Sequence, residues 1–130
     1  MNIKKFVIAM SATISGMSAL AEDLSGKPEM NGIAYSDYAG FEDKWKMFTV
    51  RYRTDTGEQR FVWGNETAMQ ALKAGSTDYP DGAVFAKIGY ETQEDPAFKD
   101  SRVPAAIKRY QFMVGDKKKF KDTGGWGYAL

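Results

Sequence analysis

Alternation of apolar and polar residues with a period of two is the feature that most constrains the fold of this chain. Residues 45–54 have the sequence WKMFTVRYRT. In this segment the apolar or aromatic side chains of Phe48, Val50 and Tyr52 alternate with the polar side chains of Thr49, Arg51 and Arg53. Residues 83–90 and 108–116 alternate in a similar way. This period is typical of β-strands that bury one face, so the three segments predict strands of a sheet.

Turn residues between these segments indicate how the strands are connected. The sequence DTGE at 55–58 predicts a tight turn into a further strand at 59–63, so that 45–63 forms an antiparallel hairpin. The sequence WGYAL at the end of the chain predicts another short strand. The predicted class is therefore α+β, with an antiparallel sheet of about five strands and one or two helices packed on it.

The clearest helix is predicted for ETAMQALKA, which begins after Asn65 and ends before Gly75. Asn is favoured at a helix N-cap, and Gly is favoured in the left-handed conformation that follows a helix. The apolar face of this helix is expected to place Ala68, Met69 and Leu72 on the sheet.

Two other segments have weaker signals. Residues 35–44 are expected to form a short helix, with Tyr38 and Phe41 pointing inward. Residues 93–106 contain two prolines and are predicted to form a long surface loop, a kind of segment that is often functional or mobile.

The N-terminus has the parts of a secretory signal peptide. Lys4 and Lys5 precede an apolar run at 6–14, and small residues then lead to an Ala-Leu-Ala sequence. We therefore expect residues 1–21 to be a cleaved signal peptide and residues 22–130 to form a single periplasmic domain. The apolar run is too short to span a bilayer, so no membrane attachment is expected after cleavage.

The chain contains neither Cys nor His, which excludes several kinds of chemistry. Thiol nucleophiles, disulfides, zinc sites of the usual type and His-based acid–base catalysis are all ruled out for these residues. Lys and Arg number 18 against 17 Asp and Glu, a formal net charge of +1, and the basic residues are scattered. Nucleic acid is therefore not an expected partner.

Lys87 is the strongest candidate for a functional side chain. It shares a face of the predicted strand with Phe85, and lysine is among the side chains least often buried. If that face is buried, the ammonium must be paired, lose its proton or react, and a desolvated lysine is the better nucleophile. If that face is exposed, Lys87 is an ordinary solvated residue. The sequence leaves both interpretations open.

Two other charged residues are weaker candidates. Arg60 offers a fixed fork of N–H donors that suits an anion, a propionate or a polar substrate, although a single arginine usually lies on the surface. Asp116 has the chemistry of a general base, but an Asp between a strand and a run of lysines is usually part of a turn. The many aromatic residues fit a packed core better than a sugar-binding surface.

The chain resembles the cytochrome P-460 family of exported bacterial c-type haem proteins in four segments: FTVRYRTDTGEQRFVWGNETAMQALKAG, YPDGAVFAKIGY, RYQFMVGD and TGGWGYAL. The sequence PDGAVFAK is the most specific part. The resemblance implies that Lys87 is the lysine that bonds covalently to the haem macrocycle, with Phe85 beside it. It also implies that Arg60 belongs to the distal pocket and that Asp116 is a distal-side acid. The implied fold is similar to the β-sheet cytochromes c′, which lack the lysine bond.

The same resemblance implies a function. Family members oxidise hydroxylamine and bind nitric oxide, so the chain is expected to be a periplasmic haem oxidoreductase or a protein that binds nitrogen oxides. Haem c is the implied cofactor. The expected partners are a small nitrogenous substrate, a periplasmic electron-acceptor cytochrome and a second copy of the chain in a homodimer.

The haem-attachment motif is where the chain departs from the family. Members carry a C-x-x-C-H motif downstream of the strand that matches GGWGYAL, whereas these 130 residues have no Cys and no His. The expectation is a C-terminally truncated chain that is inactive alone, and a haem-free homologue is the other interpretation. The alternative function is a non-catalytic exported α+β module that binds a small apolar or aromatic ligand.

Overall fold

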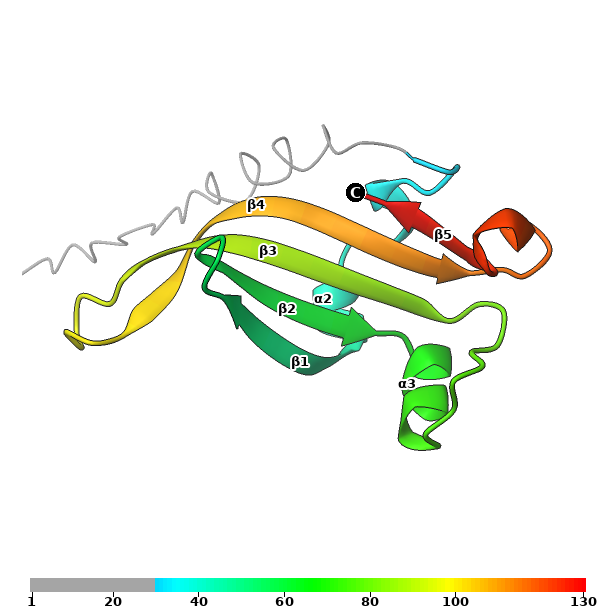
Figure 1. The fold of residues 1–130 in the computed structure, drawn as a ribbon, viewed down its shortest axis with the longest axis horizontal. Coiled ribbons are helices and arrows are strands. Elements are labelled where there is room, and N and C mark those ends of the chain that lie inside the picture. The colour runs from blue at the N-terminus through cyan, green and yellow to red at the C-terminus, as the bar shows by residue number, and fades with distance from the viewer. Residues whose placement is uncertain (1–29) are drawn as a thin grey trace, which may run out of the picture.

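Five antiparallel strands form a single sheet in which each strand lies beside its neighbours in the sequence (Figure 1). The computed structural model describes residues 30–130, so the predicted signal peptide at 1–21 lies outside the described residues. The strands are β1 (Lys46–Arg53), β2 (Glu58–Gly64), β3 (Val84–Glu94), β4 (Arg102–Gly115) and β5 (Trp126–Ala129). The helical segments are η1 (Tyr35–Asp37), α2 (Phe41–Lys44), α3 (Glu66–Lys73) and η2 (Lys121–Thr123). The predicted α+β class is confirmed.

One face of the sheet, which we call the covered face, packs against η1 and α2. Phe41 of α2 is 1% exposed, and its ring centroid lies 5.3 Å from that of Trp63 and 5.7 Å from that of Phe112. Tyr38 packs against the same core, so the prediction that Tyr38 and Phe41 point inward is confirmed. The buried members of this core are Ile33, Phe41, Trp63, Ala86, Ile88, Tyr110, Phe112 and Ala129.

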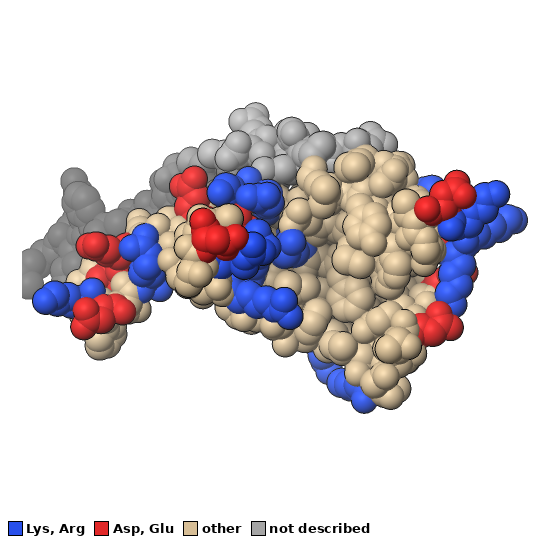
Figure 2. Space-filling model, viewed as in Figure 1, with Lys and Arg blue, Asp and Glu red and all other residues tan. Residues whose placement is uncertain are grey.

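The opposite face, which we call the open face, is not crossed by any helix of residues 30–130. In Figure 1, α2 lies behind the sheet, so Figure 2 shows the open face toward the viewer. Strand β3 contributes to both faces: Ala86 and Ile88 are buried on the covered face, while Phe85 and Lys87 are half-buried on the open face. The alternation predicted for this strand is therefore confirmed.

Strand β1 contains a bulge at Phe48, because the two neighbours of this residue in the chain pair with consecutive residues of β2. The bulge turns Phe48 to the open face, where its ring centroid lies 5.5 Å from that of Phe85. The predicted grouping of Phe48 with Val50 and Tyr52 is therefore wrong. Because β1 is the edge of the sheet, Val50 and Tyr52 stay 46% and 47% exposed.

Residues 93–106 do not form the predicted long loop. Strand β3 continues to Glu94 and β4 begins at Arg102, so only residues 95–101 connect them. Pro104 of β4 pairs with Thr92 of β3 on one side. On its other side, β4 pairs with β5 only through residues 112–115, so Pro104 has no strand neighbour there within residues 30–130. A proline fits in such a half-paired part of a strand because no second neighbour needs its missing N–H.

Helix α3 packs through Ala68, Met69 and Ala71, which are 0%, 7% and 8% exposed. The prediction is correct for Ala68 and Met69 and wrong for Leu72, which is 36% exposed. The helix sits at the end of β2, where Met69 and Phe85 both lie against Gly64, rather than flat on the sheet (Figure 1). The smaller Ala71 therefore takes the buried position.

Asn65 caps α3 as predicted and also ties the helix to β3. Its Oδ1 accepts hydrogen bonds from the backbone N–H of Ala68 at 3.0 Å and of Val84 at 3.1 Å. Its Nδ2 donates to the carbonyl of Gly82 at 2.8 Å. Gly75 follows the helix with a φ of 67°, which confirms its predicted left-handed conformation.

Replacing Asn65 with alanine is expected to lower the free energy of unfolding by about 1–2 kcal/mol, since the cap and the tie to β3 are lost together. Asn65→Asp keeps the acceptor oxygen and should lose less than half as much. Urea unfolding followed by circular dichroism measures both values. Equal losses in the two variants would contradict a role for the Oδ1 acceptor.

Candidate functional site

The open face consists of rows of cross-strand neighbours whose polarity changes along the strands. The apolar row, nearest α3, contains Phe85, Met113 and Tyr128; the middle row contains Val62, Lys87 and Gln111; the basic row contains Arg51, Arg60, Gly89 and Arg109. Figure 2 shows a broad area without charged side chains and a group of Lys and Arg side chains beside it. Lys87 therefore lies where the apolar and basic parts of the face meet.

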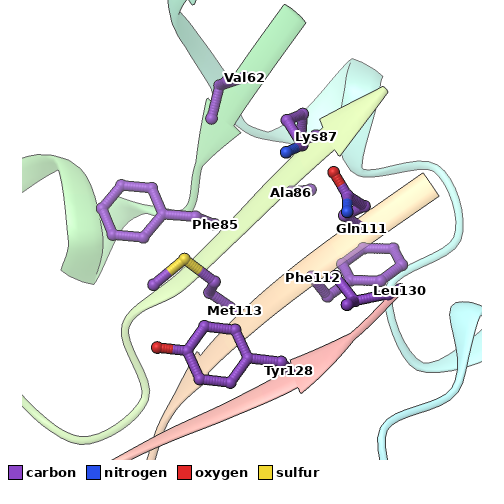
Figure 3. Close-up of a pocket in the computed structure, with 9 residues that line it drawn as sticks. All are labelled: Val62, Phe85, Ala86, Lys87, Gln111, Phe112, Met113, Tyr128 and Leu130. Carbon is purple, nitrogen blue, oxygen red and sulfur yellow. The ribbon is translucent and has the colours of Figure 1, made fainter. Parts of the chain in front are cut away.

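An apolar cavity of about 260 Å³ opens on the apolar and middle rows. In the close-up of Figure 3, the sulfur of Met113 lies between the rings of Phe85 and Tyr128, and Lys87 and Gln111 lie side by side at the other end. Phe85 also makes ring contacts with Phe48 and with Tyr79, at centroid distances of 5.5 and 5.4 Å. The cavity thus offers a flat, aromatic wall with a polar edge.

Lys87 is half-buried and makes no hydrogen bond or ion pair with any described residue. Burial lowers the pKa of its amine, and the positive charge of Arg60 lowers it further. The neutral amine is therefore populated at lower pH than for a solvated lysine, which makes Lys87 a better nucleophile. The sequence left open whether Lys87 is buried or solvated. The structure shows an intermediate case, since the side chain is neither in the core nor fully solvated.

Gln111, the cross-strand neighbour of Lys87, also lines the apolar cavity and has a side-chain oxygen without a hydrogen-bond partner among the described residues. This oxygen, Oε1, is buried. A buried acceptor without a donor costs about 1–3 kcal/mol, so a donor from a bound ligand would be stabilising. The sequence alone did not single out Gln111, because nothing local distinguishes it from a solvated glutamine on a strand.

A second cavity of about 260 Å³ adjoins the first, sharing Val62 and Lys87 with it. It is lined by Phe48, Thr49, Arg51, Arg60, Val62 and Lys87. Its lining therefore carries three basic side chains and no acidic one. Arg60, which the sequence analysis selected, is thus brought close to Lys87.

Glu58 lies at this end of the face, opposite Glu91 of β3, and its side chain is fully buried. Its Oε1 accepts from Nε of Arg60 and its Oε2 accepts from a terminal nitrogen of Arg109, both at 2.8 Å. Burial acts to raise the pKa of the Glu58 carboxyl, but the hydrogen bond from Arg60 and the charges of Arg60, Arg109 and Lys108 outweigh it and hold that pKa below its usual range. Glu58 therefore stays ionised and orients Arg60.

Two local features make this arrangement possible. Gly89 lies against the carboxylate, since a Cβ at that position would come within 3.0 Å of Cδ of Glu58. Strand β4 has a bulge at Lys108, because Arg109 pairs with Gly89 and Ile107 with Tyr90. The bulge lets both Lys108 and Arg109 approach Glu58, with Nζ of Lys108 at 3.8 Å from Oε2. Glu58 could not be selected from the sequence, because Lys108 and Arg109 are about fifty residues away in the chain and only the pairing of the strands brings them to it.

Asp116 lies apart from these residues and lines neither cavity. Its Oδ1 accepts from the backbone N–H groups of Lys118 at 3.1 Å and Lys119 at 2.9 Å. Its carboxylate thus shapes the turn after β4, which was the structural alternative in the sequence analysis. The geometry gives no support to the predicted role of Asp116 as a distal-side acid.

The donor set of the open face suits a flat apolar ligand with a polar or anionic edge. The amine of Lys87, the amide of Gln111 and the guanidinium groups of the basic row are poor ligands for a bare metal ion. Within residues 30–130, no group of three or more His, Cys, Asp and Glu side chains is placed to hold a metal.

Comparison with known proteins adds one finding. The family model described as Cytochrome P460 matches residues 38–130, which include all of the three rows and both cavities. A search of curated proteins finds no match to the chain.

Proposed function

Because the chain belongs to the cytochrome P460 family, a family of haem proteins, we propose that its open face binds haem and that the haem-loaded protein acts on small nitrogen compounds such as hydroxylamine or nitric oxide. The observation that carries this proposal is the position of Lys87. Its unpaired amine stands between an aromatic wall and a row of arginines. This arrangement suits a large planar ligand with anionic substituents.

Each part of the face has a proposed task. Phe85, Met113 and Tyr128, which line the apolar cavity, would contact the macrocycle and exclude water from it. Lys87 would hold its edge, and the covalent link implied by the family resemblance stays a prediction for this residue. Arg60 positions a polar substrate or an anionic group. Haem supplies the redox chemistry, which no side chain of this face offers.

The attachment of the haem needs separate treatment, because the 130 residues contain no Cys and no His. They provide neither thioether links nor an axial imidazole. The side chains present fit one face of the macrocycle and its edge, but not its usual c-type attachment. We therefore propose that this chain alone binds haem noncovalently and has no turnover.

Haemin added to the full chain is expected to give a saturable, red-shifted Soret band with one haemin per chain. Phe85→Ala and Lys87→Ala should each weaken binding by about fivefold or more, since an aromatic or cationic contact is worth about 1 kcal/mol. Tyr52→Ala, which removes an exposed ring on the covered side of β1, is the matched control and should leave binding unchanged.

Two outcomes would contradict the proposal. One is the absence of any spectral change at saturating haemin. The other is an equal loss of affinity in Phe85→Ala and Tyr52→Ala, which would indicate nonspecific adsorption of haemin to exposed aromatic rings.

The lack of Cys and His favours one alternative, a non-catalytic module that binds a small apolar or aromatic ligand in the same cavity. This alternative is supported if the fluorescent dye 1-anilinonaphthalene-8-sulfonate binds the folded chain, Phe85→Ala weakens that binding, and haemin fails to bind.

Further proposals concern the place of action and the partners. We propose export to the periplasm through cleavage after residue 21, transfer of electrons to a periplasmic cytochrome, and formation of a homodimer. Cell fractionation tests export to the periplasm, and sedimentation of the mature chain tests the homodimer.

A further inference from the structure

The cavity beside Arg60 has a charge that its own residues do not balance. Its basic side chains Arg51, Arg60 and Lys87 face no acidic residue across the lining. The buried carboxylate of Glu58 lies outside this lining and pairs with both Arg60 and Arg109, so it offsets only part of the positive charge. Arg51 and Arg60 are also directly opposite each other on β1 and β2. Like charges at such a pair are destabilising, so a bound anion would relieve the repulsion.

Arg60 is held in a conformation that leaves its binding groups free. Glu58 bonds its Nε, and no described residue bonds its two terminal nitrogens. The side chain of Arg60 is 19% exposed, so its position is restricted by packing as well as by the ion pair. A guanidinium fixed at Nε presents its terminal N–H groups in the fork that matches a carboxylate or another oxyanion.

The neighbouring apolar cavity indicates what the anion is attached to. The two cavities share Val62 and Lys87, so one ligand can occupy both. Its anionic group would lie at Arg51 and Arg60, and its apolar body would lie against Phe85 and Met113. The lowered pKa of Lys87 agrees with this charge distribution, because part of the lowering comes from Arg60, and an anion would reverse that part.

We propose that Arg51 and Arg60, with Lys87 at the edge, form a binding site for the carboxylate of an apolar or aromatic ligand, and that the buried Glu58 is the positioning residue of this site. The site shares Phe85, Met113 and Arg60 with the proposed haem site, so this ligand and haem would compete for the open face. The carboxylates of a porphyrin have the same chemistry as the carboxylate proposed here. A small free carboxylate is the other source of that chemistry.

The test uses the full ¹⁵N-labelled chain without haem, titrated with benzoate and with methyl benzoate, which keeps the ring and lacks the charge. Benzoate should shift amide signals of β1, β2 and β3 in a saturable way, and methyl benzoate should bind at least about fivefold more weakly. Acetate distinguishes the two sources. Binding as tight as that of benzoate indicates a free small carboxylate, and weaker binding indicates that the apolar body contributes.

Three variants locate the site. Arg60→Gln and Arg51→Gln should each weaken benzoate binding by about fivefold or more. Arg53→Gln is the matched control, since Arg53 lies on the same strand but bonds Asp55 and lines neither cavity. It should change the affinity by less than about twofold, as expected for an exposed and already paired charge. If Arg60→Gln fails to fold, Arg51→Gln decides alone, because Arg51 is exposed and outside the buried ion pairs.

The proposal is overturned if methyl benzoate binds as tightly as benzoate, or if Arg53→Gln weakens binding as much as Arg51→Gln. The first result would leave only an apolar site, and the second only a diffuse positive surface. Phe85 belongs to both proposed sites, so haemin binding is measured separately. A chain that binds haemin but gives either of these benzoate results overturns this proposal alone, and a chain that binds benzoate as expected but no haemin overturns the haem proposal alone.

Discussion

Glu58→Ala is expected to lower the free energy of unfolding by about 2–4 kcal/mol. Removing one partner of a buried ion pair leaves the other charge uncompensated, which typically costs about 3–5 kcal/mol. The cost is smaller here because the side chains of Arg60 and Arg109 are 19% and 39% exposed and regain water. Urea unfolding of the wild type and the variant measures the difference.

Glu58→Gln separates the charge of Glu58 from its packing. The amide keeps the shape and one acceptor oxygen, so the loss should be about half of that in Glu58→Ala. A Glu58→Gln variant as unstable as Glu58→Ala would mean that the charge alone contributes, and a fully stable one would mean that the ion pairs contribute nothing.

The pH dependence of stability gives an independent check on Glu58. Its pKa is lower in the folded chain than the value of about 4.3 in an unfolded one. Its contribution is therefore complete above about pH 4.3 and is lost as the pH falls through the folded pKa. The difference in stability between wild type and Glu58→Gln should shrink over that acidic range. A difference that stays constant down to pH 2 would contradict the pairing.

The second large effect is expected in the core: Phe41→Ala should destabilise the protein by about 3–5 kcal/mol. Phe41 is 1% exposed, and its ring contacts those of Trp45, Trp63 and Phe112 at centroid distances of 5.3–5.7 Å. The substitution leaves a cavity and removes the main contact of the short helix α2 with the sheet.

Phe98→Ala is the control, because Phe98 is 70% exposed in the β3–β4 connection. It should change stability by no more than about 0.5 kcal/mol. A domain is stable by about 5–15 kcal/mol, so Phe41→Ala should bring this one near its threshold and Phe98→Ala should not. Similar losses in the two variants would show that α2 is not an integral part of the core.

The parts of the fold that were predictable from the sequence depend on local signals. The alternation around Lys87 correctly assigned residues to the two faces of β3, because the period of two acts within a single strand. The N-cap at Asn65 was also correct, since the bonds that make it a cap involve nearby residues. Arg60 was selected for its chemistry, and its closeness to Lys87 follows from the pairing of β2 with β3.

The features of the fold and site that could not be predicted depend either on a β-bulge, which adds one residue to a strand, or on contacts with residues far away in the sequence. The bulges at Phe48 and Lys108 leave no composition signal, yet each changes which side chains reach the open face. Glu58 follows a turn and looks like a solvated residue until Arg60 and Arg109 are placed around it. The two prolines in 93–106 suggested a loop because the sequence does not reveal that this part of β4 has only one neighbour.

The order of the strands has a consequence for folding. Each strand pairs only with those next to it in the sequence, so the contacts of the sheet join nearby parts of the chain. Pairing between strands that follow each other in the sequence favours folding by successive addition of hairpins. We expect the Arg51–Arg60–Arg109 row to be complete once β4 has docked, while Tyr128 arrives with the last strand. A nascent chain would thus acquire its charged binding groups before its aromatic wall is closed.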